Sequence, residues 1–312
     1  MVVSRVSKEE YLKEFEDVEN VYDSVHFNEL NKNKCNQLLY LIFHDKKTQG
    51  GIIGGVIDNF FFCPFSSPFS TFSFKKPLNS ILKLEECIVA LETFLNSIKI
   101  EHVKLILPPL IYNSNSLSKF IIALQKYKWN LLYVDINYHL ETKYFSSYSS
   151  TIFRNARKNL KTAELNNLRF KKTTSLKEIK KAYQIIKNNR KAKNYPLKLS
   201  LTEVLKTIKI IPADFFIVYQ NNIGVAAAQV FYINKKIVQV IYWGEEIEYS
   251  HLRPINYLAF KLIEFYHKSN VKIIDVGPSS KNGIVNNGLA EFKESIGCKL
   301  SLKFSFQKNL KP

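Results

Sequence analysis

The stretch GLAEFKESIGC, residues 288–298, places one lysine where chemistry is possible. Three apolar side chains fall on one helical face, which predicts a short helix that packs inward: Leu289, Phe292 and Ile296. Gly297 follows them and is typical of the left-handed residue that ends a helix. Lys293 then lies at the border of the buried face. Beside a reacting carbonyl, a lysine stabilises the developing oxyanion by its charge. The alternative is a lysine whose alkyl stem packs on the core while its ammonium reaches solvent.

Further candidates stand near the ends of two strand-like runs. Tyr242 belongs to the run IVQVIYWGEE (237–246) and can donate a proton to a leaving thiolate or hydroxyl. Glu245 or Glu246, just after that strand, can act as a base through water. Asp275 stands near the end of the run VKIIDVGP. The plainer alternatives are solvated acids, a core tyrosine and an aspartate that caps a turn.

Positive charge is concentrated in one segment. The chain has 312 residues and a formal net charge of +18. Residues 154–193 carry fourteen Lys or Arg against Glu164 and Glu178, a net +12. Such a segment fits nucleic acid, anionic lipid or a phosphate-bearing ligand, or it is a solvated helical face. The scarcity of arginine, six residues against 39 lysines, weighs against base-specific readout.

Composition excludes several classes. With 46% hydrophobic residues the chain is globular, and its length is typical of two domains. No run of apolar residues reaches the ~18 that a membrane span needs, and the N-terminus becomes charged too early for a signal peptide. The four cysteines are far apart: Cys35, Cys63, Cys87 and Cys298. We expect free thiols in a reducing cytoplasm and no metal site.

The two halves of the sequence predict the same order of elements. Each reads as three strands, a long helix, a strand, a short helix and a strand. In the first half these span 38–65, 80–98, 103–109, 114–127 and 131–141; in the second, 214–246, 253–269, 271–278, 288–297 and 298–306. The segments VKLILPP (103–109) and VKIIDVGP (271–278) are the most similar pair between the two halves. We therefore predict a duplicated α/β unit with mixed sheets, divided near residues 141–150.

Three places resemble the tandem-GNAT acyltransferases, which include the Fem-type peptidoglycan aminoacyltransferases. They are FRNARKNLKTAELNNLRF (153–170), VIYWGEE (240–246) and NNGLAEFKESIGCK (286–299). The resemblance covers most of the chain. It implies two tandem GNAT-like domains: residues 1–145, a degenerate half, and residues 146–312, which carry the donor site.

The resemblance also assigns residues. The lysine that matches Lys293 lies in the active site of Fem-type enzymes, so Lys293 joins Glu245 and Tyr242 as catalytic candidates. The donor is expected near the start of the helix at Pro254, with five binding candidates: Gly244, Ser250, His251, Arg253 and Asn256. Substrate-binding candidates are Phe292, Asp275, Arg154 and Arg157. The usual Arg/Gln-x-x-Gly-x-Gly/Ala signature for CoA is absent.

Three functions follow as hypotheses. The first is an N-acyltransferase of the cytoplasm with no tightly bound cofactor. It would use acyl-CoA as co-substrate and an amine of a small molecule, sugar or cell-envelope precursor as acceptor. The second uses an aminoacyl-tRNA donor, whose backbone residues 154–193 would contact in a salt-dependent way. The third is a non-catalytic fold that binds an anionic ligand or surface through the same segment.

Overall fold

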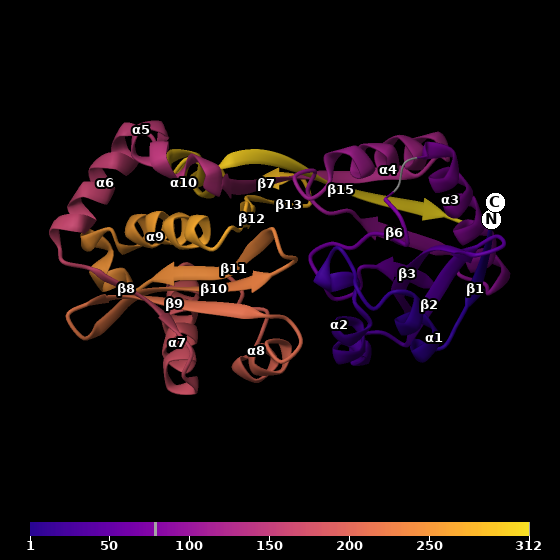
Figure 1. Ribbon diagram of the computed structural model, residues 1–312, viewed down its shortest axis with the longest axis horizontal. Helices are drawn as coiled ribbons and strands as arrows, with labels where there is room; N and C mark the ends of the chain where they lie inside the picture. The colour runs from indigo at the N-terminus through magenta and orange to yellow at the C-terminus, as the bar shows by residue number, and fades with distance from the viewer. Residues whose placement is uncertain (78–79, 312) are drawn as a thin grey trace. The chain divides into compact units, whose positions relative to one another are not determined.

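The computed structural model describes residues 1–77 and 80–311, which form two compact units (Figure 1). Unit 1 comprises Met1–Ile136, Ser280–Ile284 and Ser301–Pro312. Unit 2 comprises Asn137–Ser279 and Val285–Leu300. The chain passes from unit 1 to unit 2 within strand β7 (Asn130–Glu141). It belongs to unit 1 again over Ser280–Ile284 and returns there finally within strand β15 (Lys299–Asn309).

Unit 1 is built on a sheet with the strand order β1-β2-β3-β4-β6-β15. Its neighbours are antiparallel except for the parallel pair β4 and β6. Its other strands are β1 (Val2–Arg5), β2 (Gln37–His44), β3 (Thr48–Ile57), β4 (Phe60–Cys63), β5 (Ser73–Phe74) and β6 (His102–Ile106). Its helices are α1 (Lys8–Glu14), η1 (Val21–Asp23), α2 (Val25–Leu30), η2 (Lys32–Lys34), α3 (Ile81–Ser97) and α4 (Ser114–Lys126).

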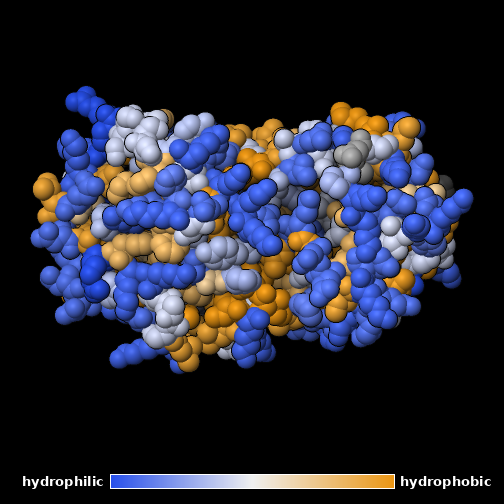
Figure 2. Space-filling model, in the orientation of Figure 1, coloured by the Kyte–Doolittle hydropathy of each residue, from blue (hydrophilic) through white to orange (hydrophobic). Residues whose placement is uncertain are grey.

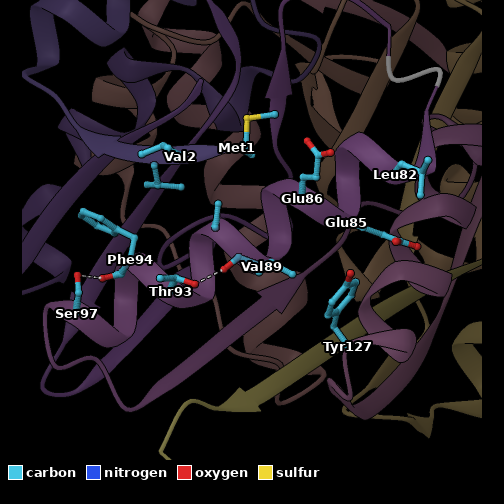
Figure 3. A pocket seen from close by; sticks show the side chains of 12 residues that line it. Met1, Val2, Leu82, Glu85, Glu86, Val89, Thr93, Phe94, Ser97 and Tyr127 are labelled. Carbon is cyan, nitrogen blue, oxygen red and sulfur yellow. Dashed lines mark hydrogen bonds between the residues drawn. The ribbon is translucent and has the colours of Figure 1, made fainter. Parts of the chain in front are cut away.

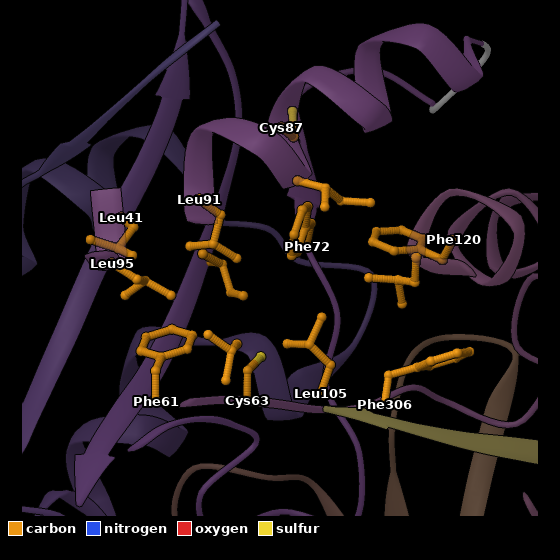
Figure 4. Close-up of a cluster of buried hydrophobic side chains, with 14 of the residues drawn as sticks. Leu41, Phe61, Cys63, Phe72, Cys87, Leu91, Leu95, Leu105, Phe120 and Phe306 are labelled. Carbon is orange, nitrogen blue, oxygen red and sulfur yellow. The ribbon is translucent and has the colours of Figure 1, made fainter. Parts of the chain in front are cut away.

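The core of unit 1 lies between its sheet and helices α3 and α4. Figure 4 shows Leu91 and Leu95 of α3 among the buried side chains, with Phe61 of β4 beneath them. The phenylalanine-rich stretch 60–74 therefore supplies core side chains. A Cβ on Gly54 would stand 2.1 Å from the Phe61 ring, so glycine at 54 makes room for that ring.

A hollow of about 700 Å³ lies between α3 and β1 in unit 1. Figure 3 shows its lining, which is mostly apolar and includes Val2, Val89 and Phe94. Glu85 and Glu86 are its acidic members. Because β1 pairs only with β2 within the described residues, this hollow borders an edge of the sheet.

Unit 2 has the strand order β7-β12-β11-β10-β9-β8, in which only β11 and β12 are parallel. Its remaining strands are β8 (Arg169–Thr173), β9 (Ala213–Gln220), β10 (Ile223–Tyr232), β11 (Ile237–Glu245) and β12 (Ile273–Pro278). Its helices are η3 (Thr142–Ser147), α5 (Tyr148–Thr151), α6 (Arg154–Leu165), α7 (Leu176–Ala192), α8 (Leu201–Thr207), η4 (Ile247–Leu252), α9 (Pro254–Lys268) and α10 (Asn287–Ser295).

Helices cover both faces of the unit 2 sheet (Figure 1). Helices α7 and α8 pack on one face, against Phe215, Ala227 and Tyr242. Helix α9 packs on the other face, where the buried Tyr266 donates to Asp214 of β9 over 3.1 Å. Each face is therefore closed by side chains from a different part of the chain.

The predicted order of elements is confirmed in both halves. The differences are local. The expected helix over 150–167 is interrupted near Ile152 and Phe153, so that α5 and α6 are separate. Two short strands that we did not expect, β13 (Ser280–Lys281) and β14 (Ile284–Val285), precede α10.

Candidate active site

Two parallel strands of unit 2 part from each other partway along their length. β11 and β12 pair through Ile237↔Ile273, Val238↔Ile274 and Gln239↔Asp275, and no further pair joins them in the described part of the chain. β11 continues to Glu245 beside β10, while β12 continues beside β7 through an irregularity after Asp275. Beyond that point the facing edges of the described strands are not paired with each other, so this opening can accept a ligand's polar groups.

Gly277 marks the end of β12 next to the opening. Its φ is +81°, in the region that favours glycine, and no described atom lies within 4 Å of where a Cβ would stand. The carbonyls of Gly277 and Pro278 both accept hydrogen bonds from the Lys293 ammonium, over 2.8 and 3.0 Å. Lys293 is thus attached to the end of the strand that leaves its parallel neighbour.

Lys293 is buried more deeply than its predicted border position implied, with 2% of its surface exposed. Burial lowers its pKa from 10.5 to about 8, against the opposing effects of the nearby Cys298 and Asp275. Its Nζ lies 5.7 Å from the centre of the Tyr138 ring. An ammonium has three N–H donors, and two are used by the carbonyls. In the part of the chain that the structure describes, the third has no hydrogen-bond acceptor.

Helix α10, which carries Lys293, is capped at both ends. Asn286 caps its start by accepting from the Leu289 N–H over 3.0 Å. Its end is closed by the bonds Gly297 N–H to Glu294 C=O and Cys298 N–H to Lys293 C=O, a Schellman motif. Gly297 has φ +83°, which confirms its predicted left-handed conformation.

Phe292 fixes the helix against β11. Its ring meets that of Trp243 edge to face, with the ring centres 6.1 Å apart. Trp243 stands beyond Gln239, where β11 has already left β12. The neighbour of Phe292 on α10, Lys293, is bonded to the end of β12. Consecutive residues of α10 therefore contact both of the strands that part.

A row of buried polar side chains crosses the sheet at the base of the opening. Side chains that pair directly across strands share a face, and this places Gln239, Asp275 and His139 together. The Asp275 carboxylate is fully buried and accepts from the Asn137 amide (2.7 Å), the Gln239 amide (2.8 Å) and the Gly277 N–H (2.9 Å). We call Asn137, His139, Gln229, Gln239 and Asp275 the polar row.

Gln229 extends the polar row onto β10. It shares its face with Phe231, which pairs with Gln239, and it stands opposite Tyr242 where the β10–β11 register shifts. Its side chain is fully buried, and neither amide atom has a hydrogen-bond partner among the described residues. Gln229 was not among the residues that the sequence indicated as candidates.

His139 is the second residue that sequence reasoning missed. It is 6% exposed, and its Nδ1 has no partner within the described part of the chain. Burial lowers its pKa, while Glu141, Asp275 and the Lys299 backbone act in the opposite direction. A signal was present in the sequence, because the polar residues Asp135, Asn137 and His139 alternate along one strand.

The start of α9, where the donor was expected to bind, is occupied by the carboxylate of Glu245. Burial raises the pKa of Glu245, and Lys193, the Ile255 N–H and Arg253 partly offset this. The Ile255 N–H belongs to the first turn of α9, which is where an anion would otherwise bind. A donor phosphate placed there would meet Glu245.

Comparison with known proteins identifies the architecture. No protein-family model and no curated protein matches the sequence. Among solved structures, FemX superposes with a TM-score of 0.71 at 11% identity, over 99% of this chain and 97% of that one. L-PGS from Bacillus licheniformis gives 0.59 at 10% identity (98% and 92% covered). A tandem GNAT protein from the clavulanic acid biosynthesis pathway gives 0.54 at 7% identity (99% and 98% covered). The chain has the tandem GNAT fold.

In this tandem GNAT fold, two of the predicted site residues serve packing. Tyr242 lies in the core beneath α7, with the Arg190 guanidinium 4.9 Å from its ring centre. Its burial raises its pKa, and the Lys198 and Leu199 backbones bond to its hydroxyl. A Cβ on Gly244 would stand 2.6 Å from that of Asn189, so glycine there permits the close approach of α7.

The remaining donor-site candidates surround the start of α9. His251 and Arg253 are exposed, and Arg253 has a left-handed φ of +57°. The His251 ring contacts the Glu248 carbonyl over 3.0 Å. The Ser250 carbonyl accepts from the Arg253 N–H, and Asn256 is buried within α9. Their role in binding a donor stays a prediction.

The basic segment of the tandem GNAT fold divides between the two faces of unit 2. Helix α6 packs on α9, whereas α7 packs on the opposite face. Arg154 is exposed at the start of α6, while Arg157 donates to the Ser150 and Ile152 carbonyls and closes the preceding turn. Figure 2 shows hydrophilic side chains spread over the surface and interrupted by apolar ones. Residues 154–193 therefore do not form a single patch.

Three further observations concern the described residues, 1–77 and 80–311. No cluster of three histidine, cysteine or acidic side chains there is arranged to hold a metal ion. None of the helices in these ranges has the length and apolar character needed to cross a bilayer. The four cysteines are free thiols.

Proposed function

We propose that unit 2 catalyses transfer of an acyl group from an activated ester or thioester to an amine. One observation carries this proposal: a buried ammonium, Lys293, is bonded to the end of β12 where the parallel strands β11 and β12 part. The tandem GNAT fold shared with FemX, L-PGS and a tandem GNAT protein supports it.

The chemistry follows from charge. When an amine attacks an acyl carbonyl, negative charge grows on the carbonyl oxygen, and a fixed donor in a water-poor site stabilises it. Lys293 meets these conditions, because two of its N–H groups fix the ammonium and the third is available. A contribution of ~3 kcal/mol, about a hundredfold in rate, is typical of one such donor.

An aminoacyl ester of tRNA is the second candidate donor. Glu245 at the start of α9 disfavours a CoA pyrophosphate at that helix end. A Fem-type donor would instead present its ester to the opening and its backbone to basic side chains such as Arg154 and Lys158, both exposed on α6. Binding of that donor would fall steeply with salt.

The test measures transfer and donor binding separately. Calorimetric titration with acetyl-CoA and with free CoA examines the first donor; filter binding of aminoacyl-tRNA in a salt series examines the second. Transfer of radiolabelled acyl groups to amine acceptors is then compared in the parent, Lys293→Met and Lys272→Met, the last being an exposed lysine that serves as control. We expect Lys293→Met alone to lose transfer. Equal transfer in all three proteins would remove Lys293 from the mechanism.

A further inference from the structure

We propose that the polar row binds the substrate's primary amine and that His139 accepts the proton which this amine releases. The inference rests on the proposed acyl transfer and names the residues that hold the nucleophile. It starts from buried polar atoms that lack partners, which native proteins rarely leave unsatisfied.

Four such atoms lie on the polar row: Asn137 Oδ1, His139 Nδ1, Gln229 Oε1 and Gln229 Nε2. Three of these can accept hydrogen bonds. The Asp275 carboxylate lies beside the Asn137 and Gln239 amides and stands opposite His139 on the neighbouring strand. An alkylammonium brings three N–H donors and one positive charge, which matches a set of acceptors beside a carboxylate. An anion would find a single unpartnered donor there.

His139 is suited to take a proton. The Lys299 backbone bonds to its ring, while Nδ1 has no partner in the described chain. When Nε2 carries the ring proton, the lone pair of Nδ1 is therefore free. Burial lowers the pKa of the ring, and the charged groups that face it are Asp275 of β12, Glu141 of β7 and Lys299 at the start of β15.

Formation of the amide removes two protons from the substrate's ammonium group. The ammonium R–NH3⁺ gives one proton to Nδ1, and the neutral amine attacks the acyl carbonyl, forming the C–N bond. The bond from carbonyl carbon to the donor's sulfur or oxygen breaks, and the leaving atom takes up the second proton of the amine nitrogen. The first proton passes from His139 to solvent, which returns Nδ1 to its neutral form. Lys293 stabilises the oxyanion and changes no bond.

Protein with nitrogen-15-labelled histidine tests amine binding beside His139 without an acyl donor. Nuclear magnetic resonance of the imidazole nitrogens follows titration with glycinamide, a small primary amine that should bind with millimolar affinity. His139→Gln assigns the signal, and His267→Gln, an exposed histidine of α9, serves as the matched control. We expect the His139 signal to shift saturably with glycinamide and to stay unchanged with tetramethylammonium, which has no N–H donor.

Two variants of Gln229 make the test specific. Gln229→Leu should weaken glycinamide binding at least tenfold, whereas the nearly isosteric Gln229→Glu should tighten it by adding a charge. A His139 signal that ignores glycinamide, or responds equally to tetramethylammonium, would mean that the polar row holds ordered water only and would overturn the inference. Failure of the proposed function would look different: amine binding would persist while no donor supports transfer.

Discussion

Lys293→Met should remove a specific rise in stability with pH. Burial lowers the Lys293 pKa from 10.5 to about 8. Below pH 8 the folded and unfolded chains both carry the charge, so the full cost of burying it is present. Between the two values the unfolded chain binds more protons than the folded one, and the free energy of unfolding therefore rises with pH. At ~1.4 kcal/mol per tenfold change in proton affinity, this rise amounts to ~3 kcal/mol.

The assay uses a fluorescent reporter inside unit 2. The chain has two tryptophans, and Trp129→Phe leaves Trp243, whose ring contacts Phe292 on the helix that carries Lys293. Urea unfolding is followed at a series of pH values from neutral to above 10 in this background, with and without Lys293→Met. Other groups titrate over the same range but cancel in the difference between the two proteins.

We expect the difference in unfolding free energy to grow by ~3 kcal/mol in favour of the lysine protein as pH rises through this window. The exposed Lys272→Met serves as control and should leave the pH dependence unchanged. Parallel curves for the lysine protein and its Lys293→Met variant would refute the reasoning, because they would show that the ammonium is solvated in the folded chain.

Three other changes have defined outcomes. Gln229→Leu should increase the free energy of unfolding of the ligand-free protein by ~1–3 kcal/mol, because it removes two unpartnered buried amide atoms. The melting temperature should rise accordingly, and a lower one would show that water satisfies those atoms. Glu245→Gln should strengthen calorimetric binding of CoA if the start of α9 can take the pyrophosphate; unchanged binding would place the nucleotide elsewhere. Gly244→Ala should destabilise unit 2 by ~1–3 kcal/mol through its contact with Asn189. Gly288→Ala, where the nearest atom is 3.9 Å away, is the control for that loss in thermal unfolding.

The candidate site was partly predictable. Lys293 and Phe292 were found through a local motif and a family resemblance, and both lie where β11 and β12 part. His139 and Gln229 were not found, since each looks like an ordinary polar residue in its own strand. Their significance comes from strands far apart in sequence, β7, β10 and β12, whose register places them on one face.

The sequence by itself determined the local features. The order of strands and helices, the end of α10 at Gly297 and the start of α3 at Ser80 depend on residues within about five positions of each other. Short-range hydrogen bonds and spacing alone specify them.

Only the tertiary structure decided which faces are buried. Alternation in β15 predicts two faces, yet the polar Ser301, Lys303 and Ser305 are buried as well as the apolar Phe306, while Leu300 is 50% exposed. In β7, likewise, Asn137 and His139 are buried together with Tyr138 and Leu140. A strand's pattern separates its two sides, but burial depends on what packs against each side, and that is set by elements distant in sequence.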